Sequence, residues 1–339
     1  MNKDIHLKEA VKSGITFDGS QVLYGKLRPY LHNWLNPDFN GIAVGDWWVL
    51  KPINMDKKFL YRLIQTQQFD NIANQSSGSK MPRADWNLIS NSVFMVPFSK
   101  EEQSKIGRYF DSLDHLITLH QRKCEQTKNL KKYMLQKMFP QNGAKVPEIR
   151  FNGFTHDWEQ RKFGSLLEET RNKTIFEDED TLLSCAIDGM YLNSQLFSHF
   201  RGSSNIGYLK VKKNDLILSA QNLHLGNCNV NLRFEHGIIS PAYKVYELVG
   251  CNPLFMQAWV KKDSTKDFFL KSSTEGASVC RKNIVWEELY KQELPVPSIE
   301  EQTKVGEYFS NLDHLITLHQ RQCDELKKMK KYMLQNMFI

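Results

Sequence analysis

Apolar residues recur at heptad spacing over two long stretches of the chain, residues 101–139 and 300–338. Neither stretch contains a proline. Each follows a proline-containing segment and begins with two glutamates, which favours the start of a helix. The a/d spacing predicts two helices that bury a narrow apolar stripe against a helical partner. At 1.5 Å per residue, each helix would be roughly 58 Å long.

The two stretches are copies of one another. They align without a gap at an offset of 199 residues, and 27 of the 39 aligned pairs are identical. Neither helix can bury its stripe alone, so the simplest arrangement is an antiparallel pair with a pseudo-twofold axis. Pairing between two chains is the alternative. The residues expected at the helix-pair interface are Leu113, Leu116, His120 and Leu130 in the first copy and Leu312, Leu315, His319 and Met329 in the second.

The repeat separates two globular blocks in which strands and helices are mixed. Runs rich in β-branched and aromatic residues predict strands at 22–28, 41–44, 47–50, 209–218, 237–239 and 244–248. A helix is expected late in each block, at about 56–73 and 253–262. The predicted fold class is α+β, with two mixed α/β domains joined by two long antiparallel coiled-coil helices. Its four parts are a first domain at 1–99, a helix and linker at 100–145, a second domain at 146–298 and a second helix at 299–339.

Composition supports ordered cores and gives the chain a modest positive charge. Of 339 residues, 41% are hydrophobic and 12% aromatic, and the formal net charge is +7. This charge suits a polyanionic partner, although many proteins without one are equally basic. No apolar run approaches the ~20 residues of a membrane span, and the start lacks an apolar signal stretch. With six scattered cysteines, we expect a cytoplasmic protein with reduced thiols and no membrane partner.

Catalytic motifs are not found in the sequence. Adenine methylation of DNA uses an Asn/Asp-Pro-Pro-aromatic turn and a glycine-rich cofactor loop. Residues 36–39 and 252–255 approach this turn but lack the second proline, so we interpret them as ordinary Asn-Pro turns. Nuclease-type carboxylates and a phosphate-binding Gly-x-x-x-x-Gly-Lys loop are also missing. No catalytic residue is therefore predicted.

Each repeat also carries the pattern His-x-x-x-x-His-x-x-x-Cys, which raises the question of a metal site. On a helix only the second histidine and the cysteine share a face, as His120 and Cys124 do in the first copy. A histidine in the helix seam is therefore preferred over a zinc ligand, and no metal is expected. Lysines near the C-terminal end of each helix are interpreted as a solvated face rather than as phosphate contacts.

Several phrases along the chain occur in a recognisable order. They are residues 22–31 (VLYGKLRPYL), 76–86 (SSGSKMPRADW), 146–151 (VPEIRF) with Trp158, and 237–243 (GIISPAY). Together with the order of block, helix, block and near-copy of the helix, they resemble the specificity subunit of type I restriction-modification enzymes. The match covers nearly the whole chain.

The resemblance implies a non-catalytic subunit that reads a bipartite target in double-stranded DNA. It also implies two modification subunits that carry S-adenosylmethionine and restriction subunits that use ATP and Mg²⁺, with no cofactor bound by this chain. Two alternatives remain open. One is a DNA adenine methyltransferase fused to its own recognition domain, and the other is a coiled-coil scaffold without a DNA role.

One departure from the family pattern concerns the first block. Gly237 lies 91 residues after Val146, whereas Gly41 lies only 40 residues after Met1. The opening Val-Pro-Glu-Ile-Arg-Phe stretch has no counterpart in the first block. The resemblance therefore predicts that the first recognition domain is truncated at its N-terminus by about fifty residues and is less stable than the second.

Residues that read bases are expected on polar and basic loops, because base edges are recognised by Arg, Lys, Asn and Gln. The candidates in the first block are Lys26, Arg28, Ser79, Lys80 and Arg83. Those in the second block are Lys210, Lys212, Lys213, Gln221, Asn222, Arg281 and Lys282. For each of them, an ordinary surface charge is the alternative interpretation.

Overall fold

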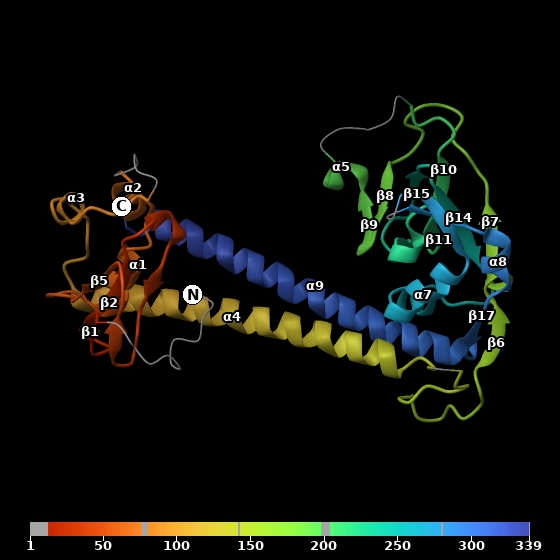
Figure 1. The fold of residues 1–339 in the computed structure, drawn as a ribbon, viewed down its shortest axis with the longest axis horizontal. Helices are drawn as coiled ribbons and strands as arrows, with labels where there is room; N and C mark the ends of the chain where they lie inside the picture. Colours follow the sequence, from red (N-terminus) through yellow and green to blue (C-terminus); the bar gives the residue numbers. More distant parts are fainter. Residues whose placement is uncertain (1–12, 76–80, 142, 198–203, 279–280, 339) are drawn as a thin grey trace. The chain divides into compact units, whose positions relative to one another are not determined.

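The protein divides into two compact units that share both long helices. The computed structural model describes residues 13–75, 81–141, 143–197, 204–278 and 281–338 (Figure 1). The first unit consists of Met1–Lys123 and Leu318–Ile339, and the second of Cys124–Thr317. Each unit therefore contains one block and one portion of each helix. The α+β fold class predicted from the sequence is confirmed.

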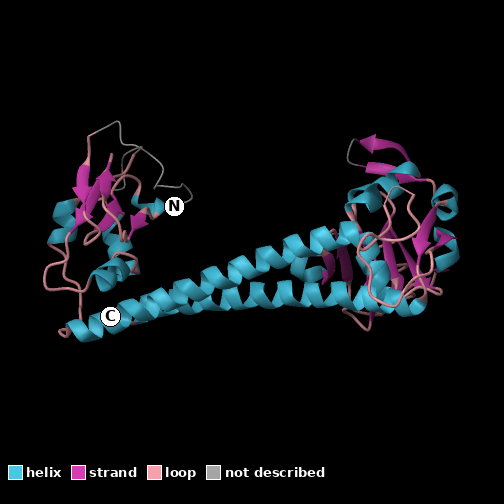
Figure 2. Ribbon diagram, turned by 90° about the horizontal axis from the view of Figure 1, so that it is seen from below, coloured by secondary structure: helices cyan, strands magenta, loops and turns pink. Residues whose placement is uncertain are grey.

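The two long helices, α4 (Lys100–Lys137) and α9 (Ile299–Asn336), pair antiparallel within one chain (Figures 1 and 2). In the first unit, the Asp114 carboxylate accepts a hydrogen bond from Lys330 at 2.6 Å. In the second unit, Lys131 pairs with Asp313 at 2.5 Å. Residue numbers rise along one helix as they fall along the other, so the pairing within one chain was predicted correctly.

The buried seam of the helix pair differs in part from the predicted one. Leu113 and Leu312 are buried as expected, at 5% and 6% exposure. The prediction for Leu116 and Leu315 is wrong, because they are 39% and 41% exposed. The residues that are buried instead include Phe110, Ile117 and Cys124 on α4 and Phe309 and Cys323 on α9.

Two more predicted interface residues lie at the edge of the seam. Leu130 and Met329 are 44% and 47% exposed, so neither belongs to the buried stripe. The Met329 Sδ atom still lies 3.8 Å from the Tyr109 hydroxyl across the pair. His120 and His319 do meet, with their Nδ1 atoms 3.1 Å apart, and form the polar layer of the seam.

The first unit is built on a small antiparallel sheet, in which β2 (Val22–Gly25) lies between β3 (Trp34–Leu35) and β5 (Trp47–Leu50). A separate pair joins β1 (Ile15–Phe17) to β4 (Gly41–Ala43). The helices are α1 (Lys57–Leu63), α2 (Gln67–Ala73) and α3 (Trp86–Ser90). The single helix predicted at 56–73 is broken, because Thr66 caps α2 by accepting a hydrogen bond from the Phe69 amide.

The second unit repeats this plan and extends it. Its central sheet has the order β12-β11-β14-β7, formed by Cys228–Val230, Leu216–Ser219, Tyr243–Leu248 and Leu167–Thr170. The two-stranded pairs are β10 (Leu209–Lys212) with β13 (His236–Ile239), β8 (Leu183–Ala186) with β9 (Gly189–Leu192), β15 (Ser273–Ser278) with β16 (Arg281–Ile284), and β17 (Glu293–Val296) with β6 (Glu159–Lys162). Its helices are α5 (Asn193–Leu196), α6 (Pro253–Val260), α7 (Asp263–Lys271) and α8 (Trp286–Lys291).

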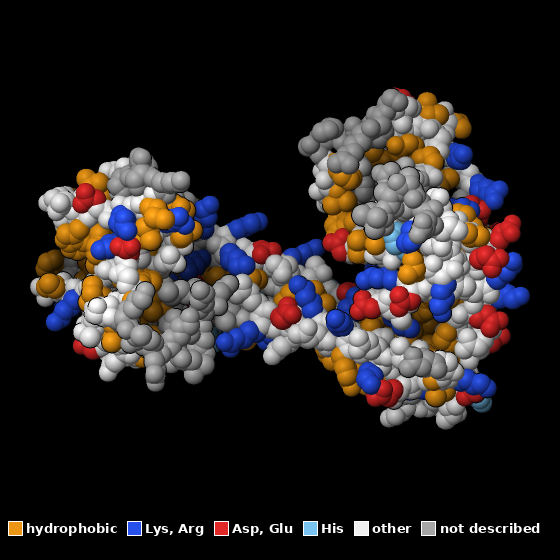
Figure 3. Space-filling model, viewed as in Figure 1, with side chains coloured by type: hydrophobic (Ala, Val, Ile, Leu, Met, Phe, Trp, Pro, Cys, Tyr) orange, Lys and Arg blue, Asp and Glu red, His pale blue; other side chains and the backbone are white. Residues whose placement is uncertain are grey.

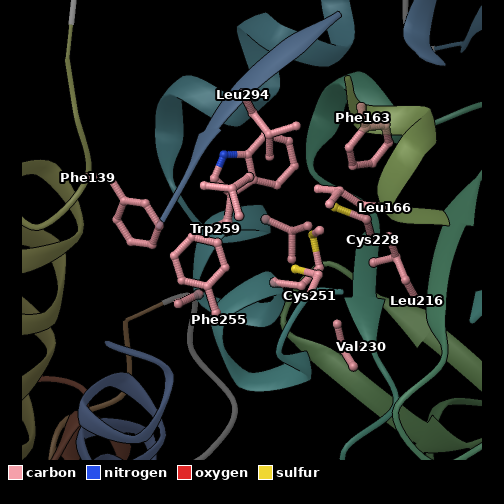
Figure 4. Packing of buried hydrophobic residues seen from close by; sticks show 14 of the residues in the cluster. Phe139, Phe163, Leu166, Leu216, Cys228, Val230, Cys251, Phe255, Trp259 and Leu294 are labelled. Carbon is pink, nitrogen blue, oxygen red and sulfur yellow. The ribbon is translucent and has the colours of Figure 1, made fainter. Parts of the chain in front are cut away.

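Aromatic side chains fill the core of the second unit. Phe163, Phe255 and Phe269 are fully buried beside Trp259, and Figure 4 shows several of these residues converging from different elements. Phe139, just beyond the end of α4, packs on Phe255 with ring centroids 5.5 Å apart. The first long helix therefore ends inside the core of the second unit.

The second long helix ends in the same way in the first unit. Phe338, just beyond α9, stacks on Phe59 with centroids 5.1 Å apart and lies 6.1 Å from Phe110. Phe338 is the repeat counterpart of Phe139, and Phe110 is the counterpart of Phe309. Each unit is thus anchored by a phenylalanine from the helix that begins in the other unit.

Candidate nucleic-acid interface

Two candidate loops of the first unit lie side by side. Main-chain hydrogen bonds run from the Arg28 amide to the Pro82 carbonyl, at 2.7 Å, and from the Ala84 amide to the Lys26 carbonyl, at 2.9 Å. Leu27 and Arg83 form a β-bridge between them. The structure therefore brings Arg83 beside Lys26 and Arg28, which lie far from it in the sequence. We call residues 26–28 and 82–84 the first loop pair.

The side chains of this loop pair are held in place rather than solvated freely. Arg28 has a left-handed backbone with φ of 51°, which costs a residue other than glycine some strain. Among the described residues, its buried Nε atom has no hydrogen-bond partner. Arg83 pairs with Asp46 at 3.3 Å and remains 54% exposed. The loop pair thus presents positive charge, and Arg28 adds one buried donor without an acceptor among the described residues.

The second unit contains a comparable loop contact with different side chains. The Lys282 amide donates to the Gln221 carbonyl at 3.1 Å, which joins strand β16 to the loop after β11. The Ala220 amide donates to the Ala242 carbonyl at 3.0 Å, as the Lys26 amide does to Asp46 at 2.9 Å in the first unit. Residues 220–222 with residue 282 form the second loop pair, which brings together Gln221, Asn222 and Lys282.

Three other predicted residues are not part of this arrangement. Lys210 and Lys212 lie on β10 and Lys213 follows in the turn that leads into β11, whereas the second loop pair lies after the other end of β11. Each lysine meets a carboxylate, Lys210 with Glu179, Lys212 with Glu247 and Lys213 with Glu235. Their charges are therefore partly neutralised within the unit.

Some predicted residues cannot be placed. Ser79 and Lys80 lie outside the described residues. Arg281 begins β16 opposite Ser278, but its side chain also falls outside the described part of the structure.

The structure adds two residues that the sequence did not single out. His224 lies in the turn after Asn222, and its pKa is lowered by burial and by nearby Lys282. The Lys244 ammonium lies over the Trp286 ring, 4.5 Å from its centroid. Neither shows a periodic signal in the sequence, since both are single polar residues whose surroundings form only in the fold.

Charges of both signs are interspersed on the visible face of the second unit (Figure 3). Across the described part of the chain, no cluster of three or more His, Cys, Asp or Glu side chains is arranged to hold a metal ion. His120 and Cys124 face the partner helix, where the Cys124 thiol approaches the Ile316 carbonyl at 3.8 Å. No helix among the described residues is long and apolar enough to cross a membrane.

Residues 35–129 match the family of the type I restriction modification DNA specificity domain. This range includes much of the first block and most of α4. Over these residues the chain is similar to the DNA specificity domain of type I restriction modification. The resemblance predicted from the order of blocks and helices is thereby confirmed.

Known relatives of the specificity domain extend the likeness over most of the chain. This chain is 22% identical over 298 residues to the type I restriction enzyme MjaVIII specificity subunit of Methanocaldococcus jannaschii. The alignment covers 82% of this chain and 68% of the relative. The type I restriction-modification S subunit from M. genitalium has a similar fold, with a TM-score of 0.63 and 15% identity over 96% of this chain and 84% of that one. A chain from a study of complex assembly and conformational transition of the type I R-M system gives a TM-score of 0.50 at 17% identity, covering 94% of this chain and 81% of that one.

Proposed function

We propose that the protein is the DNA-recognition subunit of a type I restriction-modification enzyme and reads a two-part target, one part with each unit. One observation carries the proposal. In each unit a main-chain hydrogen bond joins the loop after the central strand to a later segment, from Ala84 to Lys26 in the first and from Lys282 to Gln221 in the second, but the side chains of the two loop pairs differ. A repeated frame with different side chains is what reading two unlike sequences requires, because backbone geometry positions a reader while side chains specify bases.

In this proposal, DNA methylation and cleavage are carried out by partner subunits. Modification subunits would bring S-adenosylmethionine, and restriction subunits would bring ATP and Mg²⁺, so this chain would direct catalysis without performing it. Two modification subunits and the restriction subunits are the expected partners. The proposed role of this chain is to select the DNA site.

The test is a competition experiment with the chain and its modification subunits at fixed salt. The target is first found by sequencing methylated sites, and each half is then mutated in turn. We expect Arg28→Ala to relax one half and Lys282→Ala to relax the other, each by ~1–3 kcal/mol as for the loss of a bidentate base contact.

Lys213→Ala is the matched control in the second unit, because Lys213 is exposed and paired with Glu235 at the opposite end of β11. This substitution should reduce the slope of log affinity against log salt concentration by no more than the loss of one phosphate contact would. It should leave the base preference unchanged. Equal affinity for all sequences, or methylation of the same sites without this chain, would rule the proposal out.

A further inference from the structure

In the second unit, residues 146–162 cover the start of α9. The Arg150 guanidinium forms two hydrogen bonds to Glu301, at 2.7 and 2.8 Å, and Glu301 is only 1% exposed. Phe151 packs edge-on against Tyr308 with centroids 6.2 Å apart. Trp158 then packs edge-on against both Phe139 and Phe255, with ring centroids 6.0 and 5.9 Å away.

This covering segment ends in a strand. Glu159–Lys162 forms β6 and pairs antiparallel with β17, so that Leu294 and Val296 are 1% and 2% exposed. Main-chain pairing and apolar burial therefore continue the contacts made by Arg150, Phe151 and Trp158.

The residues that receive this segment are repeated, with the same identities, in the first unit. Glu301, Tyr308 and Phe309 correspond to Glu102, Tyr109 and Phe110, and Phe139 corresponds to Phe338. Phe59 takes the place of Phe255, because α1 packs on Gly107 as α6 packs on Gly306. At both glycines a Cβ atom would lie only 2.6 Å from a side chain of that helix.

The supporting frame is also repeated. The Gln103 side chain accepts a hydrogen bond from the Asp56 amide at 2.8 Å and donates to the Pro97 carbonyl at 2.8 Å. Gln302 makes the same kind of bridge between the Asn252 amide and the Pro297 carbonyl. The receiving surface of the first unit is therefore already shaped.

What differs is that, among the described residues, nothing covers this surface in the first unit. Glu102 is exposed and forms no ion pair there, in contrast to its buried counterpart Glu301. Met95, the counterpart of Leu294, is 67% exposed, and Phe98 is fully exposed. We call Glu102, Tyr109 and residues 94–98 the open face.

The strands of the first unit also lack neighbours that their counterparts in the second unit have, among the described residues. Strand β14 pairs with β7 on its outer edge, but its counterpart β5 has no second partner among the described strands. Ile42 is 47% exposed, whereas Ile238, which holds the same register on β13, is 0% exposed. In the second unit, all of these neighbours come from the continuous stretch 146–192.

We propose that the open face binds a second polypeptide whose segment resembles Val146–Lys162. Its arginine would pair with Glu102, an aromatic residue would pack on Tyr109, and its strand would pair with residues 94–97 by β-augmentation. A second copy of this chain is not the donor, because its own segment already fills the second unit. An exchange would fill one site by emptying another.

The probe is a synthetic peptide of residues 146–162, titrated into the full chain and followed by fluorescence anisotropy and amide hydrogen exchange. We expect saturable one-to-one binding that protects the amides of residues 94–96. Glu102→Gln should weaken binding by about tenfold or more, because it removes a charge-assisted bidentate pair. Glu101→Gln is the matched control, since Glu101 is exposed and its ion pair in the described part of the structure is with Lys105 on the same helix.

A charge exchange makes the test specific. The Glu102→Arg chain should reject the natural peptide and regain binding to the peptide that carries Arg150→Glu. Binding that is insensitive to Glu102 but strengthened by Glu301→Gln would mean that the peptide displaces the segment of the second unit. That outcome would overturn the proposal.

Two further outcomes would also overturn it. One is the absence of binding by a chain whose circular dichroism is normal. The other is concentration-dependent protection of residues 94–96 without peptide, because a second copy would then occupy the open face.

Discussion

Buried or strained polar residues mark where this chain departs from simple packing. Arg28 combines a left-handed backbone with a buried donor that has no partner among the described residues. A group of this kind is costly when isolated, so an acceptor from a bound partner would stabilise it.

Asp215 gives a prediction about pH. It is 3% exposed and accepts a hydrogen bond from the Lys212 amide at 2.7 Å, and burial raises its pKa to about 6. Because the folded pKa lies above the unfolded value, this residue's contribution to stability is present below about pH 4 and is lost as the pH rises through 6.

Asp215→Asn should remove this loss, since the amide keeps an acceptor without a charge. Urea unfolding of both proteins from pH 4 to 7 is the measurement. As the pH rises, the variant should become more stable relative to the unsubstituted protein. A constant difference would show that Asp215 ionises normally.

At this scale the sequence indicated which basic loop residues lie together in only one of the two units. Lys26, Arg28 and Arg83 were chosen as basic loop residues, and the fold brings them together. Lys210, Lys212 and Lys213 satisfied the same criterion but meet carboxylates from distant parts of the chain. A sequence pattern cannot reveal such neighbours, because they depend on strand register.

At the scale of elements, the two helices were predicted within a few residues, but their seam was not. Apolar residues occur in adjacent pairs, Tyr109 with Phe110 and Leu116 with Ile117, so the heptad pattern allows two registers. The structure buries the second member of each pair. The reason is that α4 must also pack against α1 at Gly107, which widens its apolar stripe.

Alanine substitutions on neighbouring turns test this seam. Leu113→Ala should destabilise the protein by about 2–5 kcal/mol, because it leaves a cavity in a buried contact. Leu116→Ala should cost well under half of that, because Leu116 is 39% exposed. Denaturant unfolding of both variants decides between the registers. Equal losses of unfolding free energy would favour the register predicted from the sequence, in which Leu116 is buried.

The histidine layer makes the helix pair sensitive to acid. The pKa of His120 is lowered by burial, then by His319 and Lys123. A folded pKa below the unfolded value means that stability is present above about pH 6.5 and decreases as the pH falls. His120→Gln should flatten this decrease between pH 7 and 5, measured by thermal unfolding, with the exposed His115→Gln as control. Parallel pH profiles for the two variants would contradict this account.

For the whole molecule, the internal repeat was the strongest sequence signal, because identity at a fixed offset needs no structural assumption. The second block was harder to predict in detail. Strands β6 to β9 carry weak alternation, and β6 reads Glu-Gln-Arg-Lys. Such a strand forms because β17 offers it a partner more than a hundred residues away. Local propensity contains no such information.

The anchoring phenylalanines predict coupled stability. Phe338→Ala should loosen the first unit by about 3–5 kcal/mol, since Phe338 packs against two buried rings. Phe139→Ala should loosen the second unit instead. Hydrogen exchange resolved by unit is the measurement, and a Phe338→Ala effect confined to the end of α9 would contradict this coupling.

The crossed course of the helices has a consequence for how the protein could be produced. The first unit is not a continuous piece of chain, since it combines Met1–Lys123 with Leu318–Ile339, whereas the second is the single stretch Cys124–Thr317. A cut in the linker around residues 141–146 would therefore yield two fragments that each hold parts of both units. Neither fragment could finish folding alone, but together they could reassemble through the seam and the two phenylalanines. The protein is thus suited to reconstitution as a split pair, in which the two fragments act as each other's folding template.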